Sequence, residues 1–166
     1  MRSMLEMMDV HAGLDEQFAV HRDFVVGLEF ARALSELEKF EQQLRVHMDA
    51  EETWILPVYR ERAGKVLGGD PEFFALEHKN ILRNLQTAKE SLGKLAADPG
   101  AGRRQAHEFL DQESMLLHLL QHHDLREKNT LYPRLDEVLS ESEREDLHSS
   151  AAAVRELIDA MAALPK

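Results

Sequence analysis

The sequence predicts an all-α protein: an antiparallel up-down four-helix bundle with an additional C-terminal helix. Three observations support this. Apolar residues recur three or four positions apart through most of the chain, the spacing that places them on one face of a helix. Proline, glycine and helix-capping residues divide this pattern into segments joined by short loops. No segment alternates apolar and polar residues as a half-buried strand does. A single domain of this kind fits the 166 residues.

The first two helices are predicted at about residues 13–33 and from Ser35 onward. Ser35 and Glu38 have the spacing of a capping box, in which each side chain binds the other residue's backbone N–H at the start of a helix. Pro57 predicts that the second helix ends or bends there, because proline has no N–H to donate.

The next two helices are bounded by prolines. Asp70 and Pro71 are a cap and a first helical residue, so they predict the start of the third helix, which closes at residues 98–100. The fourth is predicted at about residues 102–132, with Pro133 at its end. A second capping-box pair, Ser140 and Glu143, predicts the start of the last helix. The expected organisation is a bundle at about residues 13–135 and a C-terminal helix at about 141–164.

Composition excludes several partners. Lys and Arg number 20 against 31 Asp and Glu, a formal net charge of −11. This balance offers no basic stripe for nucleic acid and little attraction to an anionic membrane. The absence of cysteine excludes disulfides and thiolate ligands. Without a signal peptide or a membrane-spanning stretch, we expect a cytoplasmic protein. Nine histidines in a cysteine-free chain are the one compositional anomaly.

One motif occurs twice. The first copy is His47-Met-Asp-Ala-Glu51, and Pro57 follows six positions after its glutamate. The second copy is His123-Asp-Leu-Arg-Glu127, and Pro133 follows its glutamate at the same distance. Residues four apart lie on one face of a helix, so each copy directs an imidazole and a carboxylate to the same side. Two copies on two helices of one bundle favour a shared site.

Six polar residues lie at positions that periodicity assigns to the bundle interior. An unsatisfied buried polar group costs roughly 1–3 kcal/mol, so six would cancel much of a domain's stability of about 5–15 kcal/mol. They must therefore bind one another, as a metal-free polar network in a structural bundle, or bind a metal, which we favour. The six residues are His21, His47, Glu51, His78, His123 and Glu127.

The ligand types indicate the metal. Imidazole and carboxylate without thiolate suit iron, manganese or zinc, and structural zinc commonly uses cysteine. Two ions, each with two imidazoles and sharing both carboxylates as bridges, would use all six residues. We therefore expect two iron ions, bridged by the carboxylates and by an oxo or hydroxo group.

These motifs resemble those of the hemerythrin-like, or HHE cation-binding, domains. The resemblance covers about residues 14–135 and rests on four segments: residues 20–23 around His21, 47–57, 77–80 around His78, and 123–133. It implies a carboxylate-bridged, non-haem di-iron site inside a four-helix bundle.

The chain departs from the oxygen-carrying members of that family in two places. The carriers have a further histidine one turn before the position of His78, where this chain has Phe74. They also use His-x4-Asp on the fourth helix. His122 would give that spacing to Glu127, but the repeat favours His123. The resulting set of four histidines and two glutamates is more similar to the bacterial iron-sulfur-centre repair proteins, although their N-terminal cysteine is absent here.

Other residues have weaker expectations. Phe24, Trp54 and Phe74 are predicted either to line a pocket for a small ligand or to pack in the core. Glu52 is predicted to face solvent. His118 lies one turn before His122 and is predicted either to support a metal ligand from behind or, as we favour, to be partly exposed on its helix. The remaining histidines lack partner spacing and are predicted at the surface; these are His11, His107 and His148.

The function expected from these residues is binding of, or reaction with, O2 or NO at a di-iron centre, or sensing of redox or iron state. The alternative is iron storage, donation or iron-sulfur-centre repair. A ferritin-like oxidase is disfavoured, because such sites use Glu-x-x-His spacing and more carboxylates than imidazoles. The sequence identifies no site for substrate turnover and does not specify the oligomeric state.

Overall fold

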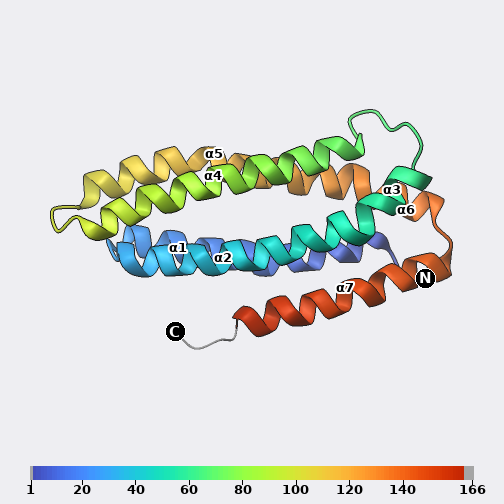
Figure 1. Cartoon of the computed structure of the whole chain (residues 1–166), viewed down its shortest axis with the longest axis horizontal. Helices are drawn as coiled ribbons and strands as arrows, with labels where there is room; N and C mark the ends of the chain where they lie inside the picture. Colours follow the sequence, from blue (N-terminus) through green and yellow to red (C-terminus); the bar gives the residue numbers. More distant parts are fainter. Residues whose placement is uncertain (1, 163–166) are drawn as a thin grey trace.

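The computed structural model describes residues 2–162, without the side chains of residues 155, 159, 161 and 162. Its described part contains helices, turns and loops and no strand, which confirms the predicted fold class. Four long helices run side by side in an antiparallel bundle (Figure 1). They are α1 (Asp9–Val26), α2 (Phe30–Ala50), α4 (Pro71–Ala97) and α5 (Arg103–Arg126), and a short 3-10 helix, η1 (Met4–Met8), precedes α1.

The turn between α1 and α2 lies at residues 27–29, so the predicted boundary between the first two helices is wrong. The backbone N–H of Gly27 closes α1 on the carbonyl of Asp23 at 2.9 Å, and Leu28 takes a left-handed φ of 63°. Ser35 and Glu38 lie inside α2 and are exposed. Their spacing does not distinguish a helix start from two neighbours on the surface of a continuing helix.

Two π-helical turns follow α2 and α5, and each begins at the glutamate of a His-x3-Glu motif. Proline lacks an N–H, and its ring clashes with the carbonyl four residues earlier, so the helix widens by one residue before Pro57 and Pro133. The helices therefore continue past both prolines. The turns are η2 (Glu51–Ile55), leading into α3 (Leu56–Arg62), and η3 (Glu127–Leu131), leading into α6 (Tyr132–Val138).

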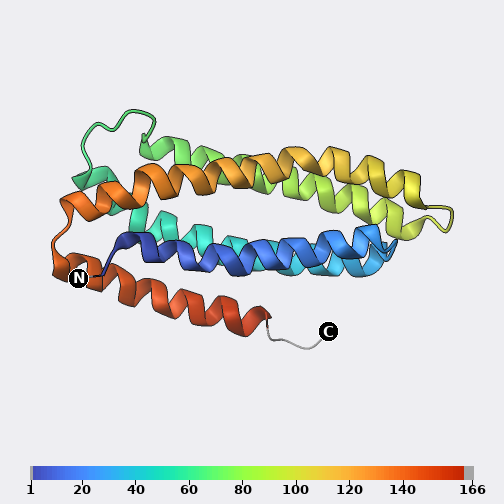
Figure 2. The same ribbon diagram turned by 180° about the vertical axis from the view of Figure 1, so that it is seen from behind.

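A fifth long helix, α7 (Glu141–Ala162), lies on the outside of the bundle. It packs along α2 and touches η1 and η2, on the side away from α4 and α5 (Figures 1 and 2). Its predicted capping box is present: Ser140 Oγ accepts from the Glu143 N–H at 3.3 Å, and Glu143 accepts from the Ser140 N–H at 2.8 Å. The predicted helix end near residue 164 lies outside the described residues. Across residues 2–162, no helix combines the length and apolar character needed to cross a membrane.

The buried apolar residues form two clusters, one on each side of a polar layer. The larger fills the half of the bundle that contains the turns at residues 27–29 and 98–102, and includes Phe18, Leu37, Phe40, Ile81 and Leu85. The smaller lies at the opposite end, under α3 and α6, and includes Met4, Tyr59, Phe74, Leu131 and Tyr132. The polar layer between them contains the predicted site.

Candidate metal centre

Four histidines and two glutamates meet in the polar layer. Their ligand atoms form two overlapping groups, each with all its atoms within 4.8 Å of one another. One group contains His11 and His47, and the other contains His78 and His123. Glu51 and Glu127 belong to both groups, and all six side chains are buried.

Each glutamate directs its two oxygens to opposite histidine pairs. Glu127 Oε1 lies 2.8 Å from His123 Nε2, and Oε2 lies 3.2 Å from His11 Nε2. Glu51 Oε1 lies 3.6 Å from His47 Nε2, and Oε2 lies 3.3 Å from His78 Nε2. A carboxylate that bridges two metal ions adopts this arrangement.

The two histidine pairs have matching geometry. The rings of His11 and His47 are 4.7 Å apart and nearly perpendicular, at 86°, and those of His78 and His123 are 4.7 Å apart at 75°. The Nε2 atoms of His78 and His123 are separated by 3.2 Å. Two nitrogens bound about 2.1 Å from one ion at right angles lie roughly 3 Å apart, so this spacing fits a shared ion.

Several atoms of the group are buried without a hydrogen bond inside residues 2–162. They are the Nε2 atoms of His11 and His47, Oε2 of Glu51 and both carboxylate oxygens of Glu127. Neighbouring imidazole and carboxylate atoms are close but lie outside hydrogen-bonding geometry, as ligands of a common ion do. Each unsatisfied buried group costs about 1–3 kcal/mol, and bound cations would remove that cost for all of them together.

Three of the histidines are oriented by carboxylates on their outer side. In each case Nδ1 donates to the carboxylate, so Nε2 can face the centre with its lone pair. Such partners fix the ring orientation of metal-binding histidines and raise their basicity. The pairs are His11 with Asp124 at 2.8 Å, His78 with Glu52 at 2.8 Å and His123 with Glu77 at 3.2 Å.

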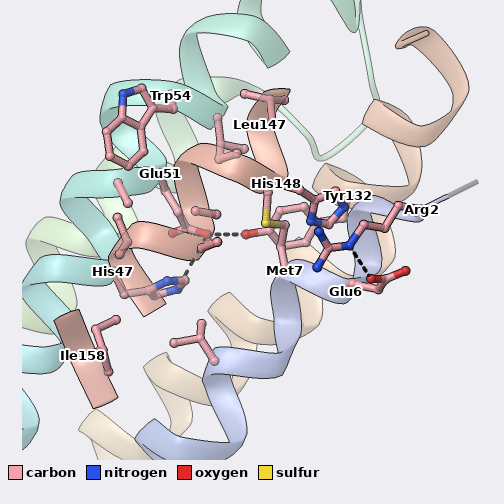
Figure 3. A pocket seen from close by; sticks show the side chains of 16 residues that line it. Arg2, Glu6, Met7, His47, Glu51, Trp54, Tyr132, Leu147, His148 and Ile158 are labelled. Carbon is pink, nitrogen blue, oxygen red and sulfur yellow. Dashed lines mark hydrogen bonds and ion pairs between the residues drawn. The ribbon is translucent and has the colours of Figure 1, made fainter. Parts of the chain in front are cut away.

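Tyr132 distinguishes the two glutamates. Its buried hydroxyl donates to Glu51 Oε1 at 2.6 Å (Figure 3). The corresponding residue of the first motif, just before Pro57, is Leu56. The carboxylate of Glu51 is therefore held by a neutral donor, whereas the contacts of Glu127 within the described residues are with the histidines His11 and His123.

Protonation holds the group together when no metal is bound. Burial opposes charge on His11, but the hydrogen bond to Asp124 and the nearby Glu127 carboxylate raise its pKa to about 10. Burial likewise opposes charge on His123, and the nearby Glu127 carboxylate nevertheless raises its pKa well above the usual value. Despite burial, these imidazoles hold the pKa of Glu127 well below its usual range. Burial lowers the pKa of His47. A metal ion would replace the histidine protons, so binding should release protons.

Five of the six predicted ligands meet in the group, and His21 does not. Its Nε2 lies 2.6 Å from Glu113, and its Nδ1 donates to the carbonyl of Ala33 at 2.8 Å. His11, predicted at the surface, is buried in its place. The cause is the misplaced turn, because residues that face each other in an antiparallel helix pair are equally far from it. His47 and His11 are about equally far along the sequence from the observed turn at residues 27–29, so they face each other. A turn near residue 34 would have placed His47 opposite His21.

The structure separates the two histidines at the end of α5. His123 is buried within the group, whereas its neighbour His122 is exposed. This placement agrees with the register that the repeated motif predicts.

The other predictions have mixed outcomes. Trp54 lines a pocket beside Glu51, whereas Phe24 lies under the Arg32 guanidinium and Phe74 packs on Tyr59 in the smaller cluster. Glu52 is exposed but also binds His78. His107 and His118 are exposed as predicted, and the prediction for His148 is wrong, because it is buried against the carbonyl of Ser3.

Comparison with known families agrees with this geometry. The family model described as the hemerythrin HHE cation-binding domain matches residues 3–135, a range that contains all six residues of the group. A search of curated proteins gave no significant match.

Proposed function

Because the chain belongs to the hemerythrin HHE cation-binding family, we propose that it is a cytoplasmic, non-haem di-iron protein that reacts with O2 or NO, and through that reaction senses redox or iron state. The observation that carries the proposal is the pair of ligand groups sharing Glu51 and Glu127. Each group offers two imidazoles and an oxygen from each carboxylate, so the donors divide evenly between two ions.

The donor set favours iron. Imidazole and carboxylate donors without thiolate suit iron, and the chain has no cysteine. Two imidazoles and two carboxylate oxygens would hold each ion, and with a solvent-derived oxo or hydroxo bridge the donors would number one fewer than an octahedron needs. When bound, iron supplies one-electron redox chemistry and this open position for a diatomic ligand.

The protein's own residues set the geometry of the centre. Asp124, Glu52 and Glu77 orient three imidazoles from behind, and the Tyr132 hydroxyl holds Glu51. Phe74, at the place where oxygen carriers have an additional histidine, is buried in the apolar cluster and offers no ligand. Among the described residues each group has the same four donors, so iron held there would keep a position for a small ligand on both sides and would be suited to oxidation by O2 rather than to its reversible storage.

Metal analysis and a visible spectrum of protein expressed with ample iron test the proposal. We expect two iron ions per chain; one ion or none would contradict it. The anaerobically reduced protein is then mixed with air and degassed. Persistence of the oxidised spectrum is expected, full recovery of the reduced spectrum would identify a carrier instead, and loss of iron to a chelator during the cycle would identify an iron-storage or donation protein.

A further inference from the structure

The pocket that Trp54 lines lies under α7, beside the metal centre but outside the bundle interior. It has a volume of about 110 Å³ and is lined by residues of η1, α1, α2, η2, α6 and α7. Glu51, His47 and Tyr132 form its inner wall (Figure 3). The rest of its surface is mainly apolar and includes Met7, Val10, Ile55, Ala151, Val154 and Ile158.

The outer wall of this pocket is specific to the C-terminal part of the chain. The family match ends at residue 135, and α7 begins at Glu141. Residues of α7 nevertheless close the pocket directly over the side of the centre that contains His47. The helix therefore encloses a space that the matched bundle alone would leave open.

The polar groups at the outer edge of the pocket are already partnered, and those of the inner wall that lack a hydrogen bond, His47 Nε2 and Glu51 Oε2, belong to the proposed metal centre. At its outer edge Arg2 donates to Glu6 at 2.9 Å, and His148 Nε2 lies 3.0 Å from the Ser3 carbonyl. On the inner wall the Tyr132 hydroxyl donates to Glu51, and Glu51 is a ligand of the proposed centre. A charged ligand would lose its hydration without gaining a counter-charge, so the pocket suits an uncharged, largely apolar molecule.

Volume sets the size of that molecule. An apolar protein cavity of about 150 Å³ is large enough to bind benzene or xenon. The pocket under α7 is somewhat smaller and partly open to solvent, so its occupant is at most about the size of a single six-membered ring.

We propose that this pocket binds a small, uncharged apolar molecule that lies against Tyr132 and the His47–Glu51 edge of the centre. Binding itself depends only on the pocket, whereas contact between this molecule and a metal-bound centre rests on the proposed function. The chemistry that the centre performs would then act on, or be modulated by, a small apolar compound.

Benzene is the probe, added to the metal-free protein and to the iron-loaded protein while chemical shifts of pocket methyl groups or binding heat are recorded. Wild type should bind in both forms, and the visible spectrum of the loaded form should change on binding. Ala151→Trp fills the pocket and should weaken binding by at least about tenfold. Ala153→Trp is the matched control, because Ala153 is exposed on the same helix and does not line the pocket, so its binding should equal wild type.

Ala151→Trp could also weaken binding by displacing α7, so a second variant changes the pocket without adding bulk. Ile158→Ala enlarges the pocket and should shift preference from benzene toward toluene. Absence of benzene binding in wild type, or equal binding by the two tryptophan variants, would overturn the proposal. If the protein binds no iron but the metal-free form binds benzene, the proposed function is wrong and the proposed binding pocket is supported. If the protein binds two irons but no benzene, the proposed function is supported and the proposed binding pocket is wrong.

Discussion

Two buried His–Glu contacts link α1 to α5 and to the π turn η3 that follows it, and they differ in which atoms they leave without a hydrogen bond. In the half of the bundle near the turns, both nitrogens of His21 have acceptors: the Ala33 carbonyl and Glu113. In the polar layer, His11 meets Glu127, but its Nε2 and both Glu127 oxygens lack a hydrogen bond inside the described residues. In the first contact both imidazole nitrogens are satisfied, and the atom that lacks a hydrogen bond inside the described residues is Glu113 Oε2. The second is complete only with a bound cation.

The difference separates structural from ligand-binding histidines. His21 Nδ1 donates to a carbonyl, so a proton must also lie between Nε2 and Glu113, and no nitrogen lone pair is available for a metal. The second oxygen of Glu113 faces the Arg22 side chain at 3.5 Å. His21 and His11 are both buried and both lie on the inner face of α1. They differ in whether both ring nitrogens have hydrogen-bond partners.

The largest contrast is expected between Glu113 of α5 and Glu127, the first residue of η3. Glu127→Gln replaces one of the two carboxylate oxygens of this residue with an NH2 group and removes its charge. The side chain can then no longer bridge two ions, so both ions should be lost. Because loss of an outer hydrogen-bond partner alone costs about 10–100-fold in metal affinity, a lost bridge should cost more than about 100-fold. Glu113→Gln should keep both ions. Metal content after dialysis measures this, and equal metal content in the two variants would remove the distinction drawn above.

The two histidines of α1 should show opposite defects. His11→Ala removes one ligand of one group, so iron should fall toward one ion per chain while the fold persists. His21→Ala leaves Glu113 buried without its partner, which typically costs about 3–5 kcal/mol of stability, but iron should remain at two per chain. Denaturant unfolding together with metal analysis tests both. Iron loss in the His21 variant, with full iron in the His11 variant, would restore the ligand set expected from sequence.

A smaller effect is expected at Tyr132. Tyr132→Phe removes the hydroxyl that holds Glu51, and metal affinity should fall by about tenfold, as for other outer partners of metal ligands. Tyr59→Phe is the control, because this equally buried tyrosine of the same cluster donates instead to the Gly69 carbonyl, at 2.8 Å. Competition with a chelator of known affinity gives both values. Equal losses would mean that the hydroxyl stabilises the end of the bundle in general.

The smallest effect lies outside both His–Glu contacts, at the start of α7. The Ser140 backbone N–H and Arg62 lower the pKa of Glu143 from 4.5 to about 2. Because the pKa is lowered in the folded state, the stabilisation of the fold by the Glu143 carboxylate is fully present above about pH 4.5 and is lost as the pH falls through about 2. The stability difference between wild type and Glu143→Gln should therefore be measurable at pH 6 and vanish near pH 2. A difference independent of pH would contradict this assignment.

Local spacing was sufficient for much of the site. His47 with Glu51, and His123 with Glu127, follow from i,i+4 geometry, and His78 follows from its place on an apolar face. His11 depends instead on where the chain turns, and Leu28 has none of the sequence preference for a left-handed backbone that glycine or asparagine provides.

Contacts between distant residues were beyond prediction. Most of the sequence of the bundle lies between Glu51 and Tyr132. The π turn at residues 127–131, directly before Tyr132, also changes the direction in which this side chain leaves the helix. Its hydrogen bond depends on both features. The outer partners Asp124 and Glu77 likewise meet their histidines only through the packing of different helices.

Ser3 and Met4, just before and at the start of η1, contact residues of α6 and α7, and this has a consequence for synthesis on the ribosome. Asp136 accepts hydrogen bonds from Ser3 Oγ at 2.5 Å and from the Met4 N–H at 2.7 Å, and His148 lies against the Ser3 carbonyl. Ser3 and Met4 are therefore synthesised well before the residues that they contact. Because chains emerge from the N-terminus onward, all six residues of the metal centre are outside the ribosome before α7 can close over them, which leaves an interval for metal to enter.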